Sequence, residues 1–181
     1  MPIAIVVMGV GGSGKTTIGT LVADHFGVPH VDADTFHPLS NVEKMRSGRP
    51  LDDDDRRPWL QAIAAHLASS IADGTGAVVG CSALKRRYRD VLRVDPAVSF
   101  LHLDGTAEVV RARMRARTGH FFGIELIASQ FADLEPLEAD EPGVVLGIER
   151  RPDELAAAAV AALTDLWTTN QQCETERTAP R

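Results

Sequence analysis

The sequence predicts an α/β fold, in which a five-stranded parallel sheet has helices on both faces. Short apolar runs, typical of buried parallel strands, alternate along the chain with longer segments of helical periodicity. A glycine-rich loop joins the first apolar run to the first helical segment, a strand–turn–helix order that suits such a fold. No linker divides the chain, so these elements are expected to share one sheet.

Five apolar runs are the candidate strands. The first run, residues 3–8, holds only apolar side chains, as expected for a strand buried on both faces. The second run is shorter and ends at Asp32. The predicted strands are residues 3–8, 28–32, 77–81, 98–103 and 143–148.

Helices are predicted between these runs, where apolar residues recur at helical spacing. The clearest is residues 59–71, because Leu60, Ile63, Leu67 and Ile71 fall on one face. The predicted helices are residues 15–26, 41–46, 59–71, 84–93, 106–117, 124–134 and 153–166.

Length and composition indicate one globular domain. The chain has 181 residues, of which 44% are hydrophobic and 24% charged, and this suits a single domain with its own core. We assign this domain to residues 1–167. Residues 168–181 are polar and show no periodicity, so we expect them to form a disordered tail.

Charge and hydropathy argue against several kinds of partner. The net charge of −6 disfavours nucleic-acid binding through bulk positive charge. No apolar run reaches the ~20 residues of a membrane helix, and no basic segment precedes the first run as in a signal peptide. We therefore expect a cytoplasmic protein that binds neither nucleic acid nor membrane, with free thiols at Cys81 and Cys173. The oligomeric state stays open, a homodimer included.

The loop after the first strand has the pattern G-x-x-x-x-G-K-[ST] of a phosphate-binding loop, or P-loop. Glycines let the backbone close around a phosphate, and the following helix adds the positive end of its dipole. Lys15 is expected to act as a catalytic residue on the β- and γ-phosphates of ATP, and the Thr16 hydroxyl to bind Mg²⁺. The residues expected to bind the nucleotide here are Gly9, Gly11, Gly12, Ser13, Gly14, Lys15, Thr16 and Thr17.

Two aspartates lie at the carboxyl end of the second strand, where ligands gather in open α/β sheets. If the strand continued past Asp32, alternation would aim Asp32 and Asp34 the same way. We expect Asp32 to hold magnesium through water, and Asp34 to be the catalytic residue that orients the acceptor hydroxyl or takes its proton. The alternative is that both are solvated loop acids or helix caps.

Further blocks of the sequence follow the P-loop. They are DADTFHP at 32–38, NVEKM at 41–45, GRPL at 48–51, DDDR at 53–56, PWL at 58–60, CSALK at 81–85, YRD at 88–90, RTGHFF at 117–122 and SQF at 129–131. Together with the P-loop, these blocks resemble the gluconokinase family, from about residue 6 to residue 141. The P-loop identifies only a superfamily, whereas the later blocks are more specific and occur in the family's order.

The resemblance implies ATP-dependent phosphorylation of D-gluconate at its 6-hydroxyl, which gives 6-phospho-D-gluconate and ADP. It also implies a fold similar to that of shikimate and nucleoside monophosphate kinases, with sheet order 2-3-1-4-5 and a mobile lid, here at about residues 117–142. Residues 147–152 depart from the family's usual Asp-rich ending of the fifth strand, so no adenine contact is assigned there.

An acceptor such as gluconate needs a cation for its carboxylate and fixed partners for its hydroxyls. Arg56 is the candidate cation. From charge pattern alone, Arg56 is equally expected to pair with the acidic residues 52–55, which also suit a helix N-terminus. Cys81 is interpreted as a packing residue, because phosphoryl transfer needs no covalent intermediate. The resemblance implies further acceptor-binding residues at His37, Lys44 and Lys85. Asp34, Ser82 and Ala83 are expected to bind the acceptor as well, because they lie at the carboxyl ends of the second and third strands.

Arg113 and Arg117 lie four residues apart on one predicted helix face and lead into the expected lid. We expect both to bind the nucleotide, with Arg117 as a catalytic residue that neutralises charge on the moving phosphoryl group. The alternative is a solvated arginine-rich helix face. His120 and Gln130 are expected to hydrogen-bond the sugar hydroxyls from the lid side.

Two other functions stay open from the sequence. A kinase for another small acceptor, such as shikimate or a nucleoside monophosphate, would keep the P-loop, but the blocks at His37 and 81–85 disfavour it. A nucleotide-binding module without turnover is disfavoured by the joint presence of Lys15, Thr16 and Asp34.

Overall fold

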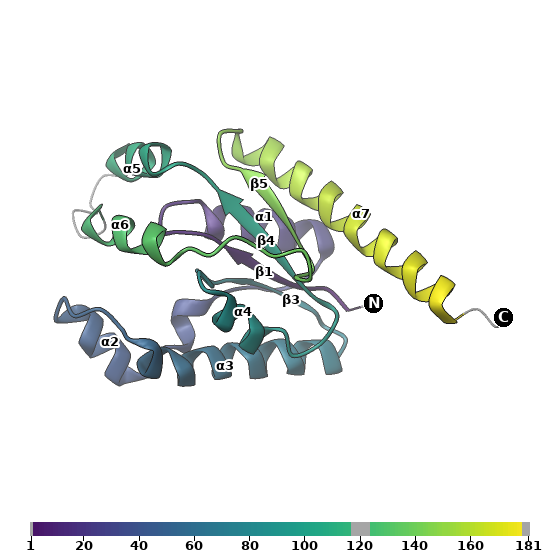
Figure 1. Cartoon of the computed structure of the whole chain (residues 1–181), viewed down its shortest axis with the longest axis horizontal. Coiled ribbons are helices and arrows are strands. Elements are labelled where there is room, and N and C mark those ends of the chain that lie inside the picture. The colour runs from purple at the N-terminus through teal and green to yellow at the C-terminus, as the bar shows by residue number, and fades with distance from the viewer. Residues whose placement is uncertain (1, 117–123, 179–181) are drawn as a thin grey trace.

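The computed structural model describes residues 2–116 and 124–178, which contain a five-stranded parallel sheet between two layers of helices (Figure 1). The strand order β2-β3-β1-β4-β5 confirms the predicted order 2-3-1-4-5. The central strand β1 pairs with β3 on one side and β4 on the other, which explains why it is wholly apolar and buried. The strands are β1 Ala4–Met8, β2 His30–Asp32, β3 Ala77–Gly80, β4 Val98–Asp104 and β5 Gly143–Gly147.

The helices connect the strands and cover both faces of the sheet, as predicted. The helix α3 packs with α4 on one face, and α1 packs with α7 on the other. In the described part of the chain they are α1 Lys15–Phe26, the short 3-10 helix η1 Ala33–Phe36, α2 Leu39–Arg46, α3 Asp53–Ala72, α4 Arg86–Leu92, α5 Ala107–Ala116, α6 Ile124–Asp133 and α7 Pro152–Thr178.

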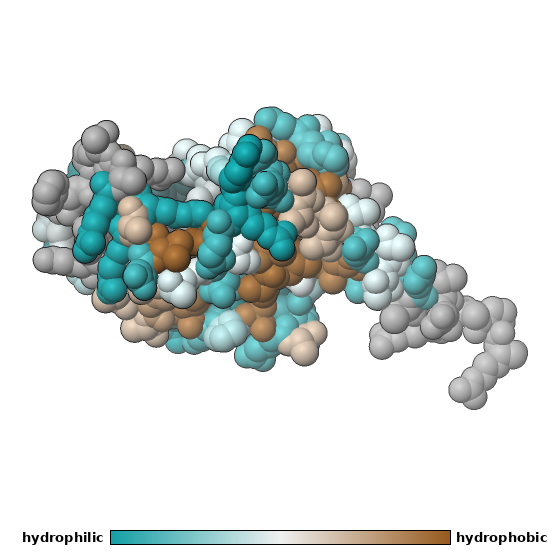
Figure 2. Space-filling view, turned by 90° about the horizontal axis from the view of Figure 1, so that it is seen from above, coloured by the Kyte–Doolittle hydropathy of each residue, from teal (hydrophilic) through white to brown (hydrophobic). Residues whose placement is uncertain are grey.

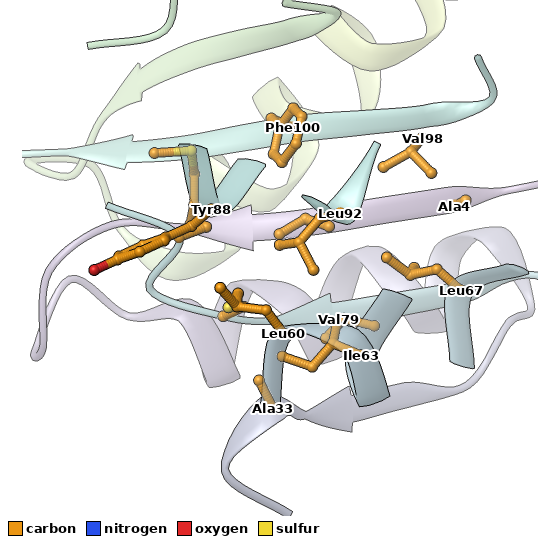
Figure 3. Packing of buried hydrophobic residues seen from close by; sticks show 14 of the residues in the cluster. Ala4, Ala33, Leu60, Ile63, Leu67, Val79, Tyr88, Leu92, Val98 and Phe100 are labelled. Atoms are coloured by element: carbon orange, nitrogen blue, oxygen red, sulfur yellow. The ribbon is translucent and has the colours of Figure 1, made fainter. Parts of the chain in front are cut away.

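Alternating residues of the sheet divide the core into two clusters. Val6 of β1 belongs to the cluster under α3 and α4, whereas its neighbour Ile5 belongs to the cluster under α1 and α7. Leu60, Ile63 and Leu67 of α3 point into the first cluster, as Figure 3 shows, which confirms the predicted apolar face of this helix. Burial on both faces holds the carboxyl ends of the strands in fixed positions.

The helix α3 begins at Asp53, earlier than the predicted start at residue 59. Asp52 and Asp55 form a capping box: the Asp55 N–H donates to the Asp52 carboxylate at 3.0 Å, and the Asp52 N–H donates to the Asp55 carboxylate at 2.9 Å. This cap begins the helix before Pro58, which therefore lies inside it. The predicted role of the acidic run as a helix N-terminus is confirmed.

The helix α7 continues to Thr178, whereas the sequence predicted a helix end at 166 and disorder over 168–181. That expectation is corrected for residues 168–178. The sequence has neither Gly nor Pro between 153 and 178 that would end the helix, and the Trp167 ring N–H donates to the Ser99 hydroxyl of β4 at 2.9 Å. Figure 1 shows the last turns of α7 extending beyond the sheet.

Residues 117–123 lie outside the described residues, and with them Arg117, His120 and the first part of the predicted lid. On the face that Figure 2 shows, hydrophobic and hydrophilic residues are interspersed. None of the helices in the described part of the chain is long and apolar enough to cross a membrane.

Candidate active site

The P-loop follows β1 and leads into α1. Gly9, Gly12 and Gly14 have positive φ angles of 135°, 82° and 105°, a region that suits glycine. A side chain at Gly9 would also stand 2.7 Å from the Leu103 carbonyl oxygen of β4, so this turn has no room for one. The loop therefore needs its glycines both for conformation and for close packing on the sheet.

Lys15 lies at the start of α1, under the loop. Its Nζ donates to the carbonyl oxygens of Gly9 and Val10, at 3.0 and 3.1 Å. Burial lowers the pKa of Lys15, and the nearby acids Asp32 and Asp34 act in the opposite direction. The ammonium group thus binds carbonyls of the phosphate loop and also feels the charges of the two acids at the carboxyl end of β2.

A cavity of about 250 Å³ opens beside the P-loop, between α1, α5 and the start of α7. Arg113 lies at its edge and joins two parts of the site: its guanidinium donates to the Ser13 carbonyl at 3.3 Å and to the Ile148 carbonyl. The cavity is lined by Gly12, Gly14, Thr17, Ile18, Arg113, Met114, Arg150, Pro152 and Leu155. Sequence reasoning missed Ile18, Met114 and Leu155, because no motif marks residues that meet only in the folded chain. Arg150 and Pro152 lie in the segment 147–152, to which the sequence assigned no contact because it departs from the family's usual ending.

The two aspartates at the carboxyl end of β2, Asp32 and Asp34, have different surroundings. The strand ends at Asp32 and η1 begins at Ala33, so the condition under which alternation would aim both side chains the same way is not met. The Asp32 carboxylate accepts from the Asp34 N–H at 3.0 Å and caps η1, whereas the Asp34 side chain is 85% exposed. Asp34 is therefore open to an acceptor, while Asp32 also holds the local backbone.

The His37 side chain is buried next to the exposed carboxylate of Asp34. Its ring stacks on that of Trp59 with centroids 4.5 Å apart, and its Nε2 lies 3.9 Å from the Asp34 carboxylate. Burial lowers the pKa of His37, and the positive charge of Arg56 lowers it further against the effect of Asp34. Trp59 also donates from its ring N–H to the Ala33 carbonyl at 2.7 Å, which ties η1 to α3.

The acidic run at the start of α3 is paired with bases other than Arg56. Lys44 binds Asp52, at 3.1 Å, and also binds Asp55. Arg57 binds Asp54 at 3.0 Å, and Arg87 binds Asp53 at 2.5 Å. Lys44, which we expected to bind the acceptor, is thus engaged by two carboxylates.

Arg56 itself makes no ion pair with a carboxylate of the described residues. Its guanidinium contacts Tyr88 instead, by a hydrogen bond of 3.4 Å to the hydroxyl and at 5.8 Å from the ring centroid. Of the two interpretations that the sequence left open, pairing of Arg56 with the acidic run is not observed. The guanidinium stands half-buried near His37, with its charge available for an anion.

The loop after β3 lies between the P-loop and α4. The Ser82 carbonyl accepts from the Gly9 N–H at 3.2 Å, and Ala83 is buried with a positive φ of 43°. Burial raises the pKa of the Cys81 thiol to about 12, which agrees with a packing residue rather than a nucleophile. Lys85 forms an ion pair of 2.9 Å with Asp133 of α6.

Gln130 of α6 contacts the nucleotide side of the site. Its Oε1 accepts from the Gly11 N–H of the P-loop at 2.5 Å, whereas the sequence led us to expect contacts with sugar hydroxyls. Gln130 and Asp133 are one helical turn apart, so α6 contacts both the P-loop and the loop after β3.

Arg89 of α4 binds the segment that follows α6. This residue is fully buried, and the sequence did not predict its role. Its guanidinium binds the buried Glu141 at 2.5 and 2.8 Å and also donates to the carbonyls of Glu135 and Pro136. This part of the predicted lid at 117–142 is therefore fixed to α4 in the structure. The YRD block at 88–90 marks Arg89 as part of the family resemblance, but its buried ion pair with Glu141 forms only in the folded chain, so the sequence did not predict it.

The chain is similar in sequence to known kinases. Residues 11–122 match the protein family described as Shikimate kinase. The chain is 40% identical to the thermoresistant gluconokinase of Escherichia coli K12 over 160 residues, which are 87% of this chain and 91% of that protein. It is 44% identical to the gluconokinase of Gluconobacter oxydans 621H over 153 residues, which are 84% and 86% of the two chains.

Solved structures with similar folds include a gluconokinase from Sinorhizobium meliloti 1021. The TM-score is 0.84 at 42% identity, over 91% of this chain and 93% of that one. A sugar kinase from Janibacter sp. HTCC2649 gives 0.85 at 47% identity, over 92% and 96%. Shikimate kinase from Aquifex aeolicus gives 0.56 at 14% identity, over 90% and 97%, which shows a shared fold alone.

Proposed function

The chain belongs to the gluconokinase family of P-loop kinases, and from this premise we propose that it transfers the γ-phosphoryl group of ATP to the 6-hydroxyl of D-gluconate. The observation that carries the proposal is the Arg56 guanidinium, which is half-buried and bound to no carboxylate among the described residues. Its charge acts on His37, the ring that lies 3.9 Å from the exposed Asp34. A cation so placed suits an acceptor that bears a carboxylate as well as hydroxyls.

On the acceptor side, Arg56 binds the gluconate carboxylate and Asp34 orients the 6-hydroxyl. The hydroxyl oxygen attacks the γ-phosphorus while the bond from phosphorus to the bridging oxygen of ADP breaks, and the hydroxyl proton passes to Asp34. The His37 ring lies next to the Asp34 carboxylate and helps to hold it in place. The loop after β3 lines the acceptor side with Ser82, Ala83 and Lys85. His120 is assigned to the sugar hydroxyls.

On the nucleotide side, the P-loop N–H groups and Lys15 bind the phosphates of ATP. The cavity beside the P-loop takes the base, with Arg150 and Leu155 on its wall and Arg113 at its edge. Arg117 is assigned to the charge that develops on the moving phosphoryl group.

Magnesium, when bound with ATP, neutralises phosphate charge and orients the β- and γ-phosphates. Thr16 and Asp32 would hold it. The Thr16 side chain is exposed at the start of α1. The Thr16 hydroxyl and the Asp32 carboxylate both offer oxygen atoms, which suits Mg²⁺ because that ion usually takes one or two carboxylates together with phosphate and water oxygens.

Release of ADP tests this proposal. Purified enzyme with ATP and Mg²⁺ is given gluconate, shikimate or a nucleoside monophosphate in turn. We expect rapid ADP release with gluconate alone, nearly abolished in Lys15→Ala without a change in its melting temperature. Release with shikimate in place of gluconate would assign another acceptor, and no acceptor-dependent release would indicate a nucleotide-binding module.

A further inference from the structure

Tyr88 of α4 lies where the hydrophobic core meets the acceptor side of the site. Its side chain is buried, and its ring packs in the same cluster as Leu92 and Phe100. Figure 3 shows its hydroxyl pointing away from the labelled core residues, towards the carboxyl ends of the strands. A ring that is fixed at one end by the core can hold a polar group in place at the other.

The Tyr88 hydroxyl is bound on both sides by charged groups of α3. It donates its hydrogen to the Asp53 carboxylate, and its oxygen accepts from Arg56 Nη1 at 3.4 Å. This direction is fixed, because a phenol has one hydrogen to give and a guanidinium can only donate. The hydrogen bond from Tyr88 lowers the pKa of Asp53, and the nearby Arg87 lowers it further.

Three cations surround the Tyr88 ring. The guanidinium carbons of Arg56 and Arg87 lie 5.8 and 5.5 Å from its centroid, and Lys85 Nζ lies at 5.9 Å. Arg87 and Lys85 each have a carboxylate of their own, Asp53 and Asp133. Among the described residues, Arg56 pairs with no carboxylate, and its guanidinium is held by the hydrogen bond and the ring contact that Tyr88 supplies.

We propose that Tyr88 is a positioning residue for acceptor binding, which holds the Arg56 guanidinium where it meets the acceptor carboxylate and keeps it from Asp53. This rests on the proposed function, in which Arg56 binds that carboxylate. Asp53 and Arg56 share the first turns of α3, three residues apart, a spacing at which acid and base readily pair. By giving its hydrogen to Asp53, Tyr88 occupies the acid that would otherwise compete for Arg56.

The test is Tyr88→Phe, which keeps the ring and the core packing and removes only the hydroxyl. We expect KM for gluconate to rise roughly tenfold, as for the loss of one hydrogen bond to a charged group. We expect kcat and KM for ATP to stay within about twofold, because the acceptor carboxylate changes little in the transition state. A merely structural defect would instead change kcat, both KM values and the melting temperature together.

A double-mutant cycle with Arg56→Ala separates this inference from the function on which it rests. In the Arg56→Ala background, Tyr88→Phe should cause no further rise in KM for gluconate. If Arg56→Ala raises this KM and Tyr88→Phe does not, the positioning role is wrong and the proposed function stands. If Arg56→Ala leaves KM unchanged, the proposed carboxylate contact itself is wrong.

Arg87→Gln is the matched control, because Arg87 lies over the same ring and pairs with the same Asp53, whereas the hydrogen bond to Arg56 comes from the Tyr88 hydroxyl. It should leave KM for gluconate within about twofold. A rise as large as that of Tyr88→Phe would show that the whole charge cluster, and not the Tyr88 hydroxyl, sets the affinity, and would overturn the inference.

Discussion

At the scale of single residues, the site separates acids and bases that look alike in the sequence. Asp32 accepts a backbone hydrogen bond and caps η1, whereas the Asp34 carboxylate is exposed and faces His37. Substitution of Asp32 and substitution of Asp34 should therefore change the activity in different ways, although the two residues are nearly adjacent in the chain.

Asp34→Asn should lower kcat by about 10²–10⁴-fold with little change in KM for ATP, because the amide neither accepts the proton nor carries charge. Asp32→Asn should instead recover part of its activity at high magnesium concentration. Initial rates measured against magnesium concentration for both variants check this prediction. Wild-type kcat in Asp34→Asn, or rescue of Asp34→Asn rather than Asp32→Asn by magnesium, would contradict the two roles.

Arg56 illustrates which part of the site the sequence could predict. Its place after an acidic run favoured pairing and anion binding equally. The structure distinguishes these because Lys44 of α2 and Arg87 of α4 take the acids, and such partners come together only in the folded chain. The spacing of the P-loop motif, by contrast, predicted a helix that begins at Lys15, and α1 begins there.

At the scale of elements, α6 bridges the two halves of the site. Gln130 binds the Gly11 N–H of the P-loop, and Asp133, one turn later, binds Lys85 in the loop after β3. A nucleotide phosphate that takes the Gly11 N–H must displace Gln130 from it. We therefore expect α6 to couple nucleotide binding at the P-loop to the loop after β3.

Gln130→Met should bind ATP about 2- to 10-fold more tightly, because it keeps the side-chain size and removes the competing acceptor. Gln130→Glu should weaken ATP binding, because a carboxylate at the Gly11 N–H repels phosphate. Calorimetric titration of both variants with a non-hydrolysable ATP analogue measures these opposite shifts. Weaker binding in Gln130→Met would show that Gln130 assists the nucleotide and does not compete with it.

The sequence predicted the positions of the strands better than the start of α3 or the order of the strands in the sheet. The buried strands were predicted to within a few residues, because apolar runs report burial directly. The start of α3 was placed after Pro58, although the Asp52–Asp55 capping box lies before it. The order of the strands came from the family resemblance, since alternation of strands and helices does not specify it.

At the scale of the whole molecule, buried histidines connect stability with pH. Burial lowers the pKa values of His30, His37 and His102 from 6.5, and Nε2 of His30 and of His102 has no hydrogen-bond partner in the described structure. His30 occupies space left by Gly19, where a side chain would stand 2.7 Å from its ring. Protonation of such rings is unfavourable in the folded state.

The free energy of unfolding should therefore fall as pH decreases below about 6.5, because the unfolded chain takes up protons that the folded histidines do not. The loss continues until the pH reaches the lowered pKa values of the folded state. Urea unfolding between pH 7 and 5 measures it, and His102→Gln should have a shallower slope than the wild-type protein. An equal slope in both would contradict the role of His102.

Carboxylates act in a separate pH window. Arg86 lowers the pKa of Asp140 from 3.8 to about 2, so the stability that this ion pair contributes is present above pH 3.8 and is lost only as the pH falls towards 2. The slope between pH 7 and 5 therefore isolates the histidines from this pair.

The most direct test compares gluconate with glucitol, which keeps the hydroxyls of carbons 2–6 and has a hydroxymethyl group in place of the carboxylate. The measurement is kcat/KM for both acceptors in the wild-type enzyme and in Arg56→Ala, with Arg57→Ala as the control because Arg57 pairs with the exposed Asp54. We predict that the wild-type enzyme and Arg57→Ala prefer gluconate at least about tenfold, and that Arg56→Ala loses this preference. An undiminished preference for gluconate in Arg56→Ala would contradict the claim that Arg56 selects the acceptor.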